Sequence, residues 1–353
     1  MRIPCRQVTR LLLWSGVAAA LLDFGAASRA RAQGLILTGY ADLEASVEGL
    51  GSDDRTVFFD NHHFNLIGIG NIIGDLFAAG EIELEHGGAE IALEYGYLLY
   101  TGIPHARIAG GKFIVPFGRF NKDLHPSWIS KVPGRPEGFS RVFPATYADV
   151  GVWVSGGVPF GVGSLDRLTY DVFVVNGLQG DPGADIRGMR PEGEPADEEN
   201  DAKSYGARLG AVLGNGLDLA VSAYRGKYNQ EEGLYLTFVG ADAAFTRSGF
   251  ELRGEWVTAL QDVPGDDELT KTAFYVQGSY LAQDRVEPTV RLSWQNFPAA
   301  QEVTRDLWRI EIGGNYYVSP SSSIRLFYLH SGERKADPEP ENDSVIAQFN
   351  IAF

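Results

Sequence analysis

The chain has 353 residues and carries 46 Asp and Glu against 30 Lys and Arg, a net charge of −16. An acidic balance of this size argues against nucleic acid as a partner, because phosphate binding needs a positive surface. The 20 Phe, 15 Tyr and 43 Gly suit strands more than helices. Cys5 is the single cysteine, so an internal disulfide does not hold the fold.

The N-terminal segment has the three-part pattern of a secretory signal peptide. Arginines precede a nearly apolar run over residues 11–22, and the small residues Ala30 and Ala32 follow it. This run is too short to span a bilayer as a helix, although a retained N-terminal anchor is the alternative. We expect a signal peptide over 1–32 and a mature domain over 33–353. Its removal would leave 25 basic against 45 acidic side chains, a net charge of −20.

Alternation of apolar and polar residues recurs from residue 35 to the C-terminus. In the first such segment, Leu35, Leu37 and Leu43 alternate with Thr38 and Asp42. Strands with one apolar face are typical of a transmembrane antiparallel β-barrel, which turns that face toward lipid. The segments number about sixteen and are 35–49, 56–70, 74–86, 89–100, 105–115, 148–158, 167–178, 203–213, 216–228, 234–246, 249–261, 270–282, 286–296, 304–318, 322–331 and 343–353. We therefore predict an all-β barrel of about 16 strands.

The connections between these segments alternate between short and long. An even strand number places both termini on the periplasmic side. Short turns expected on that side are 71–73, 214–216 and 320–321. Longer polar loops expected on the extracellular side are 181–202, 262–269, 297–303 and 332–342. The acidic stretch 191–201 is interpreted as a solvated loop, since it lacks the ligand spacing of a calcium site.

Soluble all-β folds are the alternative to a membrane barrel. Sixteen half-polar strands would leave too little core for a β-sandwich of this length. A β-solenoid or propeller would show a repeat of fixed length, which the sequence lacks. The pattern therefore favours the barrel.

Residues 116–147 do not alternate and form the third long loop. A long connection without regular structure in a compact fold is usually functional, and in a barrel this size it can fold inward and narrow the lumen. The segment has a net charge of +3, in spite of Asp123 and Glu137. Cations at a constriction favour anions. The residues expected to set anion selectivity there are Arg119, Lys122, Lys131, Arg135 and Arg141, with Lys112 on the preceding strand.

The expected lumen wall has mixed charge and leaves two alternatives open. Its residues are Glu81, Glu83, Glu85, Glu94, Arg253, Arg291, Arg309 and Arg325. In one alternative, the loop cations only pair with the acids between Glu81 and Glu94 and fix the loop in place. In the other, the wall carboxylates set a cation preference.

Phe353 ends the last alternating segment. A terminal aromatic residue on such a strand is typical of outer-membrane barrels, in which the ring lies at the membrane interface. We interpret Phe353 as a barrel-assembly signal and expect its strand to pair with the first strand near Leu35 to Val47.

Enzymatic and metal-binding functions are weakly indicated. The histidines are His62, His63, His86, His105, His125 and His330, and they form no Ser-His-acid pattern. A hydrolase such as a lipase is a minor alternative to a non-enzyme. Asp60, His62 and His63 could bind a metal, but adjacent residues of a regular strand point to opposite faces. We therefore expect neither a metal nor another cofactor.

The stretch from Phe64 to Gly180 resembles the phosphate-selective porin family (the O and P porins). The resemblance rests on four sequence pieces, Glu81 to His86, Val115 to Asn121 followed by His125 and Pro126, Asp149 to Val152, and Val175 to Gly177. It implies a sixteen-stranded, homotrimeric channel for passive diffusion of small anions such as phosphate. It also implies a Gram-negative outer membrane, with lipid, lipopolysaccharide and the barrel-assembly machinery as partners. A non-conducting barrel that acts as a scaffold or binds a partner protein is the alternative.

Overall fold

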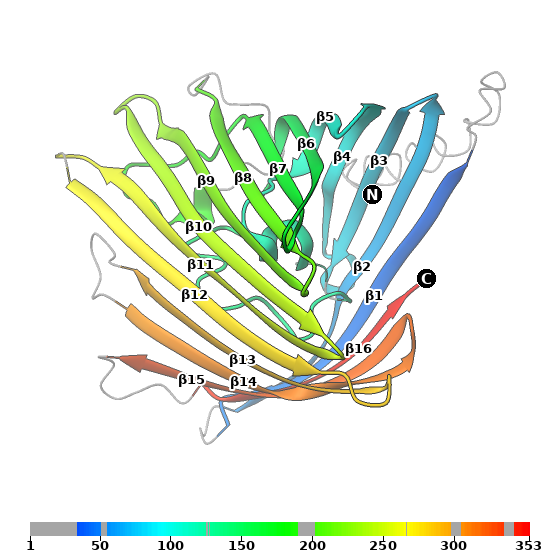
Figure 1. Cartoon of the computed structure of the whole chain (residues 1–353). Helices are drawn as coiled ribbons and strands as arrows, with labels where there is room; N and C mark the ends of the chain where they lie inside the picture. Colours follow the sequence, from blue (N-terminus) through cyan, green and yellow to red (C-terminus); the bar gives the residue numbers. More distant parts are fainter. Residues whose placement is uncertain are drawn as a thin grey trace, which may run out of the picture.

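The computed structural model is a closed barrel of sixteen antiparallel strands, in which each strand pairs with its sequence neighbours and β1 pairs with β16 (Figure 1). The predicted fold class and strand number are therefore confirmed. The predicted signal peptide and the acidic stretch 191–201 lie outside the described residues, as does His125. The structure describes residues 34–50, 55–124, 126, 128–189, 202–265, 267–297, 305–334 and 342–353.

All sixteen expected segments overlap the observed strands. In chain order the strands are β1 Leu35–Glu48, β2 Thr56–Ile73, β3 Leu76–Glu85, β4 Glu90–Ile103, β5 Ala106–Ile114, β6 Ala148–Val162, β7 Leu165–Val175, β8 Ser204–Leu213, β9 Leu217–Asn229, β10 Leu234–Arg247, β11 Phe250–Val263, β12 Asp267–Tyr280, β13 Val286–Phe297, β14 Arg305–Ser319, β15 Ser322–Arg334 and β16 Ser344–Ala352. Short helical turns occur at η2 His86–Gly88, η3 Phe120–Leu124 and η4 Ile186–Met189. No helix among the described residues is long and apolar enough to cross a membrane.

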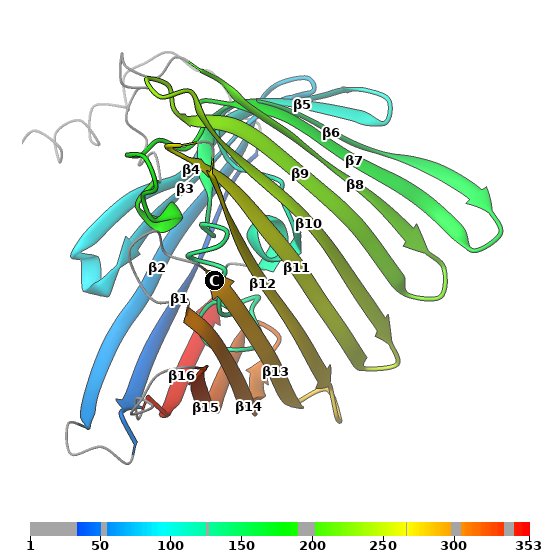
Figure 2. The same cartoon turned by 90° about the vertical axis from the view of Figure 1, so that its left-hand side faces the viewer.

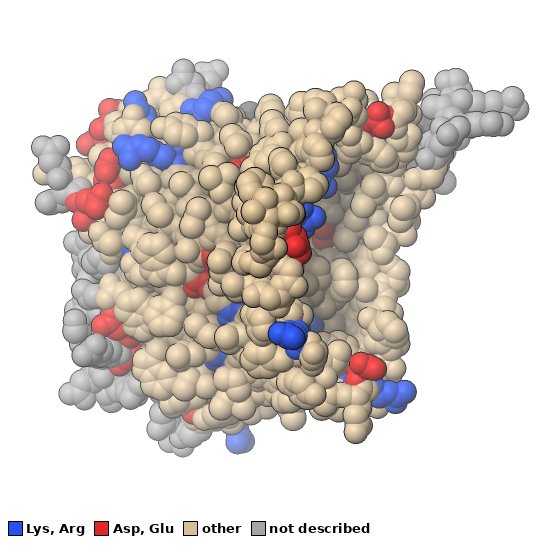
Figure 3. All heavy atoms as spheres, viewed as in Figure 1, with Lys and Arg blue, Asp and Glu red and all other residues tan. Residues whose placement is uncertain are grey.

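The barrel is apolar outside, and its inner wall is polar except where the loop packs against it. On β9, Val221 is 56% exposed, whereas the adjacent Ser222 is buried. On β16, Phe349 points outward between the buried amides Gln348 and Asn350. Much of the surface seen in Figure 3 is uncharged. An exterior of this kind is stable against lipid, because the strands satisfy their backbone hydrogen bonds within the closed sheet.

The last strand closes the barrel as expected. β16 pairs with β1 from Tyr40 opposite Ala352 to Glu48 opposite Ser344. Phe353 then exchanges two backbone hydrogen bonds with Gly39, at 2.9 and 3.0 Å. No strand edge is left facing lipid at this seam.

The prediction of a turn at residues 71–73 was wrong. These residues continue β2, and the chain reverses at Gly74 and Asp75. Gly74 has a φ of +54°, a backbone conformation that glycine adopts without strain. The expected turns at 214–216 and 320–321 do lie between strands.

Bulges within β2 and β4 interrupt the alternation that the sequence suggested. In β2, two residues lie opposite one residue of β1, between the pairs Asp42–His63 and Glu44–Asp60. In β4, Glu94 is the extra residue opposite β3. A bulge changes which face the following side chains occupy.

The bulge at Glu94 changes which side chains of β4 point outward. Leu93 points outward before the bulge and Leu98 after it, whereas Tyr97 packs against the interior core. The regular alternation expected over the segment 89–100 therefore does not continue past Glu94.

The connection between β5 and β6 folds into the barrel. This loop, teal in Figures 1 and 2, runs within the ring of strands in both views. Many of its aromatic residues are fully buried against the inner wall, including Phe117, Phe120, Phe139 and Phe143. The predicted inward-folded third loop is confirmed in this respect.

Candidate functional site in the barrel lumen

An aromatic cluster fixes the loop against one wall of the barrel. Phe117 stacks on Phe143 with ring centroids 4.6 Å apart. Both rings contact Phe238 of β10, at 6.0 and 5.1 Å. A buried aromatic residue contributes large apolar area, so these rings hold one end of the loop on β10.

A wall carboxylate binds the backbone of the loop directly after this cluster. Glu255 of β11 accepts hydrogen bonds from the backbone N–H groups of Arg119 and Phe120, at 3.1 and 2.8 Å. Gly118 has a φ of +63°, and a Cβ at this position would lie 1.8 Å from Glu255 Oε1. The glycine is therefore required by both conformation and space.

Asn121 joins the two ends of the loop. Its Nδ2 donates to the carbonyl oxygens of Val115 and Tyr147, at 2.7 and 3.2 Å. Its Oδ1 accepts from the backbone N–H of Tyr147 at 2.7 Å. The sequence piece from Val115 to Asn121, which carried the family resemblance, therefore serves to dock the loop in this chain.

Two of the loop cations pair with acids of the wall that the loop covers. Arg119 lies 3.1 Å from both Asp218 and Asp242. Lys122 lies 2.6 Å from Asp171. These pairs take up positive charge that the sequence assigned to anion selectivity.

Lys131 and Glu137 make further ion pairs between loop and wall. Lys131 lies 2.9 Å from Glu251 and 2.5 Å from Glu287. Glu137 lies 2.5 Å from Arg309. Burial raises the pKa of Glu137, and the positive charge of Arg309 offsets part of this increase.

The acids that pair with the loop cations are not the ones expected from the sequence. The sequence suggested the acids of 81–94, but the acids that pair with Arg119, Lys122 and Lys131 lie on β7, β9, β10, β11 and β13. The partners are more than 45 positions away in sequence, so local patterning could not identify them.

Three wall arginines also contribute to structure. Arg253 lies 3.1 Å from Glu251, and Arg291 forms a buried ion pair with Glu311. Arg325 donates to the carbonyl oxygen of Trp128 in the loop, at 3.3 Å.

Lys112, three wall acids and Arg141 complete the predicted site residues. Lys112 donates to the carbonyl oxygen of Leu93, at 2.6 Å. Glu81 and Glu83 accept from the amide of Asn65, at 2.7 and 3.0 Å, and Glu94 is buried. Arg141 is half-buried in the loop.

A cavity of about 550 Å³ separates the later half of the loop from the opposite wall. Its described lining includes three acids on one side, Glu83, Glu85 and Glu90, together with His62, His63 and His86. The cationic lining residues are Arg135 on the loop, Arg187 in η4 and Arg325 on β15. A second cavity of about 520 Å³ shares Pro133, Gly134 and Arg135 with the first. Arg135 thus lies where the two cavities meet.

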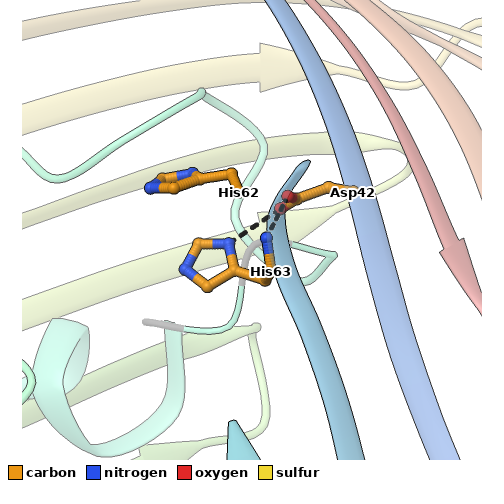
Figure 4. A group of neighbouring side chains, drawn as sticks. All are labelled: Asp42, His62 and His63. Carbon is orange, nitrogen blue, oxygen red and sulfur yellow. Dashed lines mark hydrogen bonds and ion pairs between the residues drawn. The ribbon is translucent and has the colours of Figure 1, made fainter. Parts of the chain in front are cut away.

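The histidines of β2 lie on the same side of the strand. The ring centroids of His62 and His63 are 4.0 Å apart, and Figure 4 shows both rings projecting the same way. The expectation that they point to opposite faces was wrong, because the β2 bulge breaks the alternation between them. Sequence analysis had no signal for this bulge.

A closed sixteen-stranded barrel with an apolar exterior and an inward-folded loop defines an outer-membrane barrel of the porin type. Barrels of this architecture span the outer membranes of Gram-negative bacteria. No protein-family model matches the chain. An uncharacterized protein of Aquifex aeolicus (strain VF5) is 27% identical over 165 residues, which are 43% of this chain and 36% of that protein. The chain thus aligns with about a third of that relative.

Several solved outer-membrane proteins share the fold. An anion-selective porin from Comamonas acidovorans has a TM-score of 0.66 and 11% identity, over 91% of this chain and 99% of the porin. OmpF of Salmonella typhi, in complex with daunomycin, has a TM-score of 0.64 and 13% identity, over 90% and 97%. The trimer form of OmpT from Vibrio cholerae has a TM-score of 0.60 and 12% identity, over 91% and 99%. At these identities the likeness shows the fold alone.

Proposed function

We propose that the protein is a porin that allows passive diffusion of small hydrophilic solutes. The observation that carries the proposal is the polar cavity of about 550 Å³ that remains between the docked loop and the wall of β2 to β4. A loop that only filled the barrel would not leave such a space. We propose no enzymatic activity.

We further propose a mild preference for anions, with phosphate as one candidate solute. Arg135, Arg187 and Arg325 line the cavity, and cations beside a pore attract anions by focusing the field. Glu83 and Glu85 lie 3.9 and 3.4 Å from His63, which reduces their effect when the imidazole is protonated. The preference would therefore depend on the arginines that line the cavity rather than on Arg119, Lys122 and Lys131, which pair with carboxylates elsewhere on the wall.

We also propose a homotrimer, by analogy with the fold. One structural neighbour is described as a trimer, and the extensive apolar exterior offers area for subunit contacts as well as for lipid. Contact with lipopolysaccharide and recognition by the barrel-assembly machinery, through Phe353, belong to the same proposal.

Conductance and ion selectivity in planar bilayers test the proposal. Stable ion-conducting steps support a porin, whereas a folded barrel without conductance favours the scaffold alternative. Reversal potentials in a salt gradient at low ionic strength then report selectivity. The anion preference is wrong if the wild-type channel selects cations. Hydrolysis of lipid or ester substrates by the folded barrel would contradict the absence of enzymatic activity.

A further inference from the structure

The β2 bulge assembles a cluster of metal-ligating groups on the cavity wall. Ligand atoms of Asp42, His62 and His63 all lie within 4.8 Å of one another. The same holds for His63, Glu83 and Glu85. His63 belongs to both sets, so five side chains from three adjacent strands converge on one region.

The distances around His63 suit direct coordination. Its Nε2 lies 3.4 Å from Glu85 Oε1 and 3.9 Å from Glu83 Oε1. Two ligands that are each about 2.1 Å from a tetrahedral zinc ion lie about 3.4 Å apart. A cation between these atoms would therefore need only small shifts of two glutamate side chains.

The other ring nitrogen of His63, Nδ1, contacts a carboxylate, as is usual for metal-binding histidines. Its Nδ1 lies 3.0 Å from Asp42 Oδ2, and its backbone N–H donates to Asp42 Oδ1 at 2.8 Å (Figure 4). A carboxylate at Nδ1 keeps the proton there and directs the Nε2 lone pair toward a metal. Asp42 thus orients the ring while Nε2 faces the glutamates.

His62 supplies a second imidazole at the same place. Its ring lies 4.0 Å from that of His63 and 5.7 Å from that of His86, measured between centroids. No hydrogen bond or ion pair of His62 occurs within the described part of the chain, although all other groups of the cluster have one. A small rotation of this side chain would bring it to a cation bound at His63.

We propose that His63, Glu83 and Glu85, with His62 as a further ligand, bind a divalent transition-metal cation of the zinc class inside the pore. Imidazole together with carboxylate suits zinc, nickel or copper, whereas magnesium and calcium prefer oxygen ligands alone. The carboxylates offset the charge of the cation, and the cavity gives it access from the lumen.

Calorimetric titration of the detergent-folded barrel with Zn²⁺ tests the site and does not require the protein to conduct ions. We expect saturable binding of one ion per chain. His63→Gln and Glu85→Gln should each weaken it at least about tenfold, and Asp42→Asn about tenfold through loss of the orienting bond. His105→Gln is the matched control, because His105 lies in the short turn between β4 and β5, outside the cavity lining, and should leave the affinity unchanged.

Heat-modifiable migration on a denaturing gel identifies the variants that fold. If His63→Gln fails to fold, His62→Gln is the second variant, since its side chain makes no hydrogen bond within the described structure, and it should also lower the affinity. The proposal is overturned if wild type shows no saturable binding, or if the folded variants bind Zn²⁺ as tightly as wild type. Should the channel conduct, Zn²⁺ ought to lower the single-channel current and a chelator to restore it. A zinc-insensitive current with binding intact would contradict only the proposed function at this cavity.

Discussion

Substitution of Gly118 by Ala tests whether the wall carboxylate Glu255 holds the loop in place. The new Cβ would lie 1.8 Å from Glu255 Oε1, so the carboxylate has to move away. Glu255 then loses its hydrogen bonds from the backbone of Arg119 and Phe120. Hydrogen bonds of this kind are worth about 1 to 3 kcal/mol each.

The backbone contributes a second cost. A residue other than glycine at a φ of +63° is destabilised by about 1 to 2 kcal/mol. Gly134, in the same loop, has a φ of +71° but open space around its Cβ position. Gly134→Ala is therefore a control that carries the backbone cost without the collision. The difference in the free energy of loop docking between the two variants measures the loss of the Glu255 contacts, and it should be at least about 2 kcal/mol.

A loss of this size raises the ratio of undocked to docked loops at least about 30-fold. Single-channel recordings of Gly118→Ala should show a larger and noisier current than those of Gly134→Ala. Limited proteolysis should cut the loop faster in the first variant. Glu255→Ala should also loosen the loop. Adding Gly118→Ala to Glu255→Ala should destabilise the docked loop only by the backbone cost of about 1 to 2 kcal/mol, because the colliding carboxylate is absent. The reasoning is refuted if Gly118→Ala and Gly134→Ala behave alike in both assays.

Three further predictions follow from the loop, the cavity and the seam. Arg135→Gln should shift the reversal potential in a salt gradient toward cations, because it removes a cation from the junction of the two cavities; an unchanged potential would exclude Arg135 as a determinant of selectivity. Arg309→Gln should raise the pKa of Glu137 further, because burial already raises it and the offsetting charge is lost. The docked loop then binds a proton more tightly than the undocked one, so docking weakens as pH rises. Proteolysis of this variant should therefore accelerate more than that of wild type as the pH rises above about 4.3, the usual pKa of a glutamate. Deletion of Phe353 should lower the amount of heat-modifiable barrel in the outer membrane without changing single-channel conductance, and normal insertion would contradict its role in assembly.

The strands were predictable because lipid imposes a simple rule on them. Residues such as Val221 and Phe349 must face outward while Ser222 and Gln348 face the lumen, and this constraint is visible in the order of residues. Period-two patterning therefore located every strand to within a few residues.

The candidate site was only partly predictable, because it depends on irregularities and on distant contacts. Bulges at residues 61–62 and at Glu94 insert one residue without a distinctive sequence, yet the first of them brings His62 and His63 to one side. Arg119 was correctly recognised as a loop cation, but its partner Asp242 is 123 positions away. Pairing across such a separation is set by how the loop folds back, which local composition does not encode.

The seam between β1 and β16 has a consequence for the order of assembly. Thr38 Oγ1 donates to the backbone oxygen of Phe353 across 315 positions, so the contact that completes the barrel has nearly the highest sequence separation possible among the described residues. Contacts of this separation form late and slowly, because a long stretch of chain has to be ordered before they are gained. Until that moment two strands with open hydrogen-bonding edges exist in the same molecule, and each is a template for pairing with another copy. The barrel is thus most prone to aggregation immediately before it becomes its most stable form.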